Sequence, residues 1–76
     1  MVAAQGDPLL GETLRKLIAT LAEAPRMVMI LRYQEDLDPM EISELLEIPL
    51  ATVKSHLQRS LALLREKLAR RGLGER

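Results

Sequence analysis

The 76-residue chain contains no cysteine, phenylalanine or tryptophan, and it has a single tyrosine and a single histidine. The absence of cysteine excludes disulfides, thiolate metal sites and a cysteine nucleophile. One histidine, His56, cannot form a metal site without carboxylate help. No histidine or serine is placed to work with the glutamates, and there is no glycine-rich phosphate loop. We therefore expect no catalytic residues, no metal and no cofactor, and the chain is not expected to be an enzyme.

Long apolar segments are also absent. No run approaches the roughly 20 residues that a membrane span needs. Residues 1–8 lack the basic stretch followed by an apolar stretch that characterises a signal peptide. We expect a cytoplasmic protein with no membrane partner.

Leucine-rich helical periodicity fills most of the chain, and no strand pattern appears. The expected fold is all-α: a four-helix domain with a C-terminal helix-turn-helix and no winged element. The first helix is expected to run from Pro8 to about Leu21 and the second from about Pro25 to Gln34. The third is expected from Pro39 to before Pro49, and the fourth from Pro49 or Leu50 to about Arg71. Residues 1–7 are interpreted as a disordered start or linker remnant, 8–72 as the domain, and 73–76 as a frayed tail.

Local signals support these limits. Asp7 before Pro8 is typical of a helix start, and Asp38 with Glu41 predicts a capping box. Apolar spacing predicts that three side chains of the third helix face inward, namely Ile42, Leu45 and Leu46. The predicted core stripe of the last helix is Leu50, Val53, Leu57, Leu61, Leu64 and Leu68. Three methionines are interpreted as gap-fillers in an aromatic-poor core, Met27, Met29 and Met40.

The net charge is zero, but the charges are not evenly distributed. Residues 1–48 carry four basic and nine acidic side chains, whereas residues 49–76 carry seven basic and two acidic ones. Cations near the C-terminus of a helix are favoured by its dipole. This explanation applies much less to Lys54 and Arg59, which lie near the start of the last helix.

A short capped helix, a tight turn and a longer helix together describe a helix-turn-helix, whose second helix can enter the DNA major groove. At 100° per residue, Thr52, Ser55 and Arg59 lie opposite the leucine stripe. Gln58 and His56 flank them, and Lys54 lies closer to the core edge. Arg59 can pair with guanine and Gln58 with adenine, whereas threonine, lysine and histidine suit phosphate.

Three segments carry a family resemblance. Residues 21–33 (LAEAPRMVMILRY) resemble the start of region 4 of bacterial RNA polymerase sigma factors, with Arg26 and Leu31-Arg32-Tyr33 in matching places. Residues 40–59 (MEISELLEIPLATVKSHLQR) are similar to the helix-turn-helix of that region, and Leu63-Leu64-Arg65 to the tail that follows. The resemblance covers about residues 10–70. It is closest to the extracytoplasmic-function (ECF) group, whose last domain reads the −35 promoter element.

The resemblance implies roles for individual residues. Base reading falls to Lys54, Ser55, Gln58 and Arg59, and DNA backbone contact falls to Pro49, Thr52 and His56. The implied partners are promoter DNA, the β flap of core RNA polymerase and an anti-sigma factor. A sigma factor also needs a domain for the −10 element, so the chain is expected to be the C-terminal piece of a longer protein.

The chain departs from the family pattern in four ways. Ala22-Glu23 replaces the usual double proline, and Glu47 replaces a turn glycine at a cost of about 1 kcal/mol if its backbone is left-handed. His56 and Leu61 stand where arginines are common, and a histidine is fully charged only in mildly acidic solution. These two changes predict weaker DNA affinity than that of a typical member.

Two alternatives remain open. Residues 52–57 (TVKSHL) also resemble the recognition helix of LuxR-type response-regulator output domains, which are DNA binders too. In a different class, Leu57, Leu61, Leu64 and Leu68 have the spacing of a short coiled coil, which would make the chain a weak homodimer or a protein-interaction module.

Overall fold

The computed structural model describes residues 8–70, with side chains from residue 11 onward. Four helices fill this range: α2 (Pro8–Ile18), α3 (Glu23–Tyr33), α4 (Pro39–Leu46) and α5 (Leu50–Arg70). No strand occurs within residues 8–70, which confirms the all-α prediction there. The Asp7 cap, the expected start at 1–7, the expected helix end near Arg71 and the expected tail at 73–76 lie outside the described residues.

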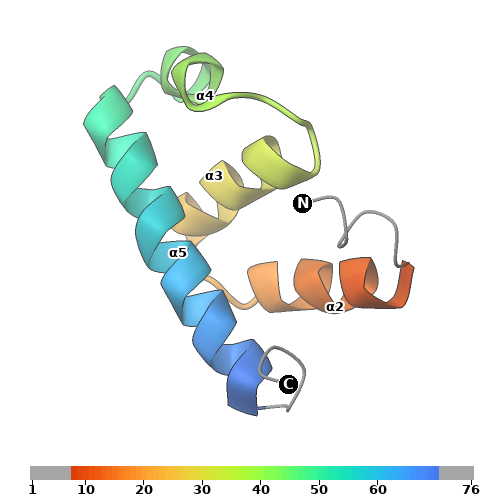
Figure 1. Cartoon of the computed structure of the whole chain (residues 1–76). Coiled ribbons are helices and arrows are strands. Elements are labelled where there is room, and N and C mark those ends of the chain that lie inside the picture. Colours follow the sequence, from red (N-terminus) through yellow and green to blue (C-terminus); the bar gives the residue numbers. More distant parts are fainter. Residues whose placement is uncertain (1–7, 71–76) are drawn as a thin grey trace.

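The long helix α5 organises the domain (Figure 1). It contacts each of the other three helices. In Figure 1, α4 lies at one end of α5 and α2 lies toward the other, with α3 between them. The first half of α5 therefore packs in the helix-turn-helix, and the second half packs near α2.

The corner between α2 and α3 differs from the expected one. α2 ends at Ile18, and the Thr20 hydroxyl donates a hydrogen bond to the Leu17 carbonyl (2.6 Å). α3 begins at Glu23, two residues before Pro25. Pro25 still lies in the first turn, where its missing N–H has no intrahelical acceptor to lose. Ala22 precedes the helix and provides no side-chain cap.

Two hydrophobic clusters form the core. The first cluster joins α2, α3 and the second half of α5, and its buried members are Leu17, Ile18, Leu21, Met29 and Leu64. The second cluster joins α3, α4 and the first half of α5 through Val28, Ile42 and Val53, each fully buried. Leu57 packs against both clusters.

Three predicted core positions are wrong. Leu45 is 60% exposed, Met40 is 53% exposed and Met27 is 44% exposed, whereas Met29 is buried as predicted. α4 has only about two turns, so it buries the narrow sector that contains Ile42 and Leu46. Around the helix axis, Leu46 lies about 40° to one side of Ile42, whereas Leu45 lies about 60° to the other side and so falls outside the buried sector. Sequence spacing alone did not distinguish the two leucines.

Candidate nucleic-acid interface

The start of α4 is fixed by a reciprocal pair of hydrogen bonds. The Glu41 N–H donates to Asp38 Oδ1 and the Asp38 N–H donates to Glu41 Oε1, both at 2.8 Å. This arrangement is the predicted capping box, with Pro39 in the first turn. The connection between α3 and α4 is bonded to the end of α3 at Leu37. Arg32 Nη1 donates to the Leu37 carbonyl (3.4 Å), and the Leu37 N–H donates to the Leu31 carbonyl (3.0 Å).

The turn between α4 and α5 depends on Ser43 and Glu47. Glu47 has a left-handed backbone (φ 58°), as the missing family glycine implied. The Ser43 carbonyl accepts from the N–H groups of Glu47 and Ile48. The Ser43 hydroxyl in turn donates to the Ile48 carbonyl at 2.6 Å. Sequence reasoning missed Ser43, although a serine near a helix end commonly bonds to nearby backbone.

The entry to α5 is set by backbone and core together. The Pro49 carbonyl accepts from the N–H groups of Thr52 and Val53 (3.0 and 3.1 Å). Val53 is fully buried in the second cluster, one turn after the helix begins. This anchor holds the inner face of α5 against α3 and α4, so the opposite face of its first half points away from the domain.

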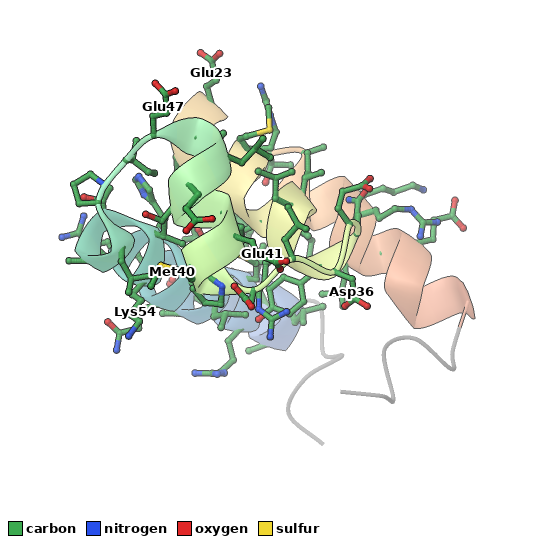
Figure 2. The ribbon with its side chains drawn as sticks, turned by 90° about the horizontal axis from the view of Figure 1, so that it is seen from above. Glu23, Asp36, Met40, Glu41, Glu47 and Lys54 are labelled. Carbon is green, nitrogen blue, oxygen red and sulfur yellow. The ribbon has the colours of Figure 1, made fainter. Side chains whose placement is uncertain are left out.

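All seven predicted DNA-contact residues remain accessible. Lys54, Gln58, Arg59 and Pro49 are exposed, and Thr52, Ser55 and His56 are half-buried. Figure 2 shows Lys54 at the edge of the molecule, directed outward. Within the described part of the chain, none of these side chains makes a hydrogen bond or an ion pair. We call the surface formed by Lys54, Ser55, Gln58 and Arg59 the outer face of α5.

The excess of positive charge on the described helices lies on α5, whereas α2, α3 and α4 together carry four basic and four acidic side chains. α5 carries five basic side chains and one acidic one, Glu66. Two of its basic groups have partners: Lys67 donates to Thr20 Oγ1 (2.6 Å) and Arg70 pairs with Glu66 (2.8 Å). Lys54, Arg59 and Arg65 have no such partner among residues 11–70. The positive charge of Lys54 and Arg59 on the outer face of α5 is therefore available to a ligand.

Two features are absent from this part of the chain, namely a cluster of metal ligands and a membrane-spanning helix. Among residues 11–70, no three His, Asp or Glu side chains come together as metal ligands. None of the helices between residues 8 and 70 combines the length and apolar character needed to cross a bilayer.

Comparison with known families agrees with this geometry. The family described as "Sigma-70, region 4" matches residues 11–64, which include all of α3 and α4 and most of α5. The chain belongs to this family. The resemblance given by its sequence motifs is thereby confirmed. The match favours the sigma factor over the LuxR-type alternative.

A relative supports the ECF type of this sigma-70 region 4 domain. Over 59 residues, this chain is 37% identical to "ECF RNA polymerase sigma factor SigW" of Bacillus subtilis (strain 168). That alignment covers 78% of this chain and 32% of the relative, so the chain spans about a third of the relative's length. No solved structure matches the chain significantly. The roles of individual residues in base and phosphate contact stay predictions.

Proposed function

We propose that this region 4 domain binds the −35 promoter element, as the DNA-binding part of a sigma factor that directs transcription initiation. The observation that carries the proposal is the outer face of α5, whose polar and basic side chains have no partner in the described part of their own chain. The helix that bears them is held by the capping box, the Ser43 turn and buried Val53. A rigid helix with free base-reading side chains is suited to the major groove.

The proposal assigns different chemistry to neighbouring residues. Arg59 bonds guanine at two points, and Gln58 pairs with adenine. Lys54 and Ser55 extend the contacts along the groove. Thr52, His56 and the Pro49 entry lie against phosphates, where the first-turn N–H groups of α5 also attract anions.

We further propose that RNA polymerase and an anti-sigma factor are protein partners. The family resemblance implies that the domain docks on the β flap of the core enzyme. Exposed apolar side chains are suited to such protein contact, and Leu63 exposes 41% of its surface. Because the chain has no net charge, polymerase would hold the domain near DNA that it binds only weakly alone. The role proposed is one of binding in the cytoplasm, without catalysis.

A test of the DNA proposal is selection of duplexes from a random library by the isolated chain at low salt. We expect a shared short motif. Arg59→Ala should relax preference at one base position and weaken binding to the selected site by about fivefold to 150-fold. Arg65→Ala is the matched control, because it removes an exposed, unpaired arginine one and a half turns away.

Two results would contradict the proposal. One is a library that yields no motif, and the other is an Arg59→Ala variant that selects the same motif as Arg65→Ala with the same affinity. A shift assay at physiological salt adds a further check. Nanomolar specific binding by the isolated chain would contradict the expected dependence on polymerase.

A homodimer through the leucine stripe of α5 has less support. Leu57, Leu61 and Leu68 pack against the first cluster of the same chain, and Leu64 is 3% exposed within it. Sedimentation at several concentrations tests this alternative, and a stable dimer would restore it.

A further inference from the structure

A shallow groove of about 450 Å³ lies between the start of α3 and the end of α4. Its lining residues are Glu23, Ala24, Met27, Val28, Leu46 and Ile48. The first four belong to α3, and the last two flank Glu47 in the helix-turn-helix turn. Two segments about 20 residues apart in sequence therefore form one concave surface.

The floor of this groove is apolar and its rim is acidic. Val28 is fully buried at its base, Leu46 and Ile48 are half-buried, and Met27 exposes 44% of its surface. Glu23 and Glu47 are both exposed, and Figure 2 shows them at the same edge of the molecule, directed outward. Among the residues whose side chains are described, no basic one lines the groove.

The groove is separate from the outer face of α5. In Figure 2, Glu23 and Glu47 lie at the top of the molecule, and Lys54 lies well below them on the left. Carboxylates on the rim repel phosphate, so DNA is an unsuitable occupant. An anionic partner is disfavoured for the same reason.

We propose that this groove docks a cationic amphipathic helix from a protein partner. Its apolar side chains would pack on Met27, Leu46 and Ile48, and lysines or arginines beside them would pair with Glu23 and Glu47. A flexible methionine suits such a surface, because it can adapt to the shape of the apolar side chains that enter. The opposite charges also direct the approach of the partner. This inference goes beyond the proposed function, because the groove uses other residues than DNA binding does.

The position of the groove has a consequence for assembly. It adjoins the turn that precedes α5, but it leaves Lys54, Ser55, Gln58 and Arg59 uncovered. A partner in the groove therefore covers none of the proposed base-reading residues, although Ile48 directly precedes Pro49, which we place against phosphate. Such a partner could contact the domain while it lies on a promoter.

The experiment is an NMR titration of the ¹⁵N-labelled chain with a synthetic helical peptide. The peptide carries leucines at helical positions i, i+3, i+4 and i+7, with lysines on both sides of that stripe. The control peptide has glutamate in place of every lysine. We expect shift changes with the lysine peptide that are centred on Ala24, Met27, Leu46 and Ile48, and at least about fivefold weaker binding of the glutamate peptide.

Charge-reversal variants localise the effect. Glu23→Lys with Glu47→Lys should weaken the lysine peptide by at least about fivefold. The matched control is Glu35→Lys with Glu44→Lys, which changes the net charge equally at two exposed sites outside the groove lining and should bind the peptide nearly as the parent does. Circular dichroism should show both double variants folded.

Several results would overturn the proposal. Equal binding of both peptides, equal loss in both double variants, or shifts centred on α2 or α5 would each do so. Shifts at the groove that grow with protein concentration before peptide is added would identify a second copy of this chain as the occupant instead.

Discussion

The first and second halves of α5 carry the same kinds of basic side chain, but their surroundings differ. In the second half, Lys67 is bonded to Thr20 and Arg70 to Glu66. In the first half, Lys54 and Arg59 have no partner among the described residues of their own chain. The comparison teaches that positive charge on a helix does not by itself identify a nucleic-acid surface. In the first half both basic groups are unpaired and are carried by a well-supported helix, whereas in the second half, among the same described residues, only Arg65 is unpaired.

The support for the two halves also differs. The first half rests on three fully buried aliphatic side chains and on a turn closed by side-chain hydrogen bonds. The second half packs against α2, whose corner with α3 has no side-chain cap at Ala22. The half proposed to read DNA is thus held by more specific local geometry.

The largest expected effect comes from removing the support of the first half. Ile42→Ala should lower the free energy of unfolding by about 2–5 kcal/mol, because a fully buried side chain is replaced by a cavity. Leu45→Ala on the same helix is the control and should change it by less than about 0.5 kcal/mol, since Leu45 is 60% exposed. Urea unfolding followed by circular dichroism measures both. Equal decreases in the free energy of unfolding would show that buried Ile42 and exposed Leu45 contribute equally to stability.

A second pair of variants compares the two halves directly. Lys54→Ala should weaken binding to all duplexes several-fold and reduce the slope of log affinity against log salt by about 1, with little change in stability. Lys67→Ala should lower the free energy of unfolding by up to about 1 kcal/mol, because its bond to Thr20 is lost, and should leave the salt slope nearly unchanged. Fluorescence anisotropy at several salt concentrations and urea unfolding distinguish these effects. An equal fall in salt slope for both lysines would remove the distinction between the halves.

The smallest expected effect concerns the turn at Glu47, which joins α4 to the first half of α5. Glu47→Gly should raise the free energy of unfolding by about 1 kcal/mol, because glycine adopts a left-handed backbone without a Cβ clash. Glu44→Gly, three residues earlier in the interior of α4, should lower it by about 1 kcal/mol. Thermal unfolding of both variants gives the sign of each change. A loss of stability in Glu47→Gly would mean that the left-handed residue is not strained.

Features encoded by neighbouring residues could be predicted from the sequence. The capping box needs only Asp38 and Glu41 three residues apart, and the left-handed Glu47 follows from the glycine that the family has there. The accessibility of Lys54, Gln58 and Arg59 followed from helical periodicity, because a 21-residue helix with one apolar stripe has a well-defined opposite face. The individual roles of these residues at bases and phosphates stay predictions.

Features that depend on packing between helices could not be predicted in this way. Leu45 has the same chemistry as Leu46, and only the packing of α4 against α3 and α5 decides that Leu46 is the more buried of the two. Ser60 is 2% exposed, three residues after Leu57 and four before Leu64. Its spacing could have revealed it, but a serine was not considered for an apolar stripe. The acidic groove joins α3 to a distant turn, and no local pattern indicates it.

The position of Leu57 in both clusters has a consequence for how the domain unfolds. Since one side chain completes the packing on either side of it, neither cluster can separate without exposing part of the other. The domain should therefore melt as a single cooperative unit, with the same midpoint whether secondary structure or the environment of Tyr33 is followed. The most protected amides of α5 should exchange only through global opening, at similar rates on both sides of that leucine.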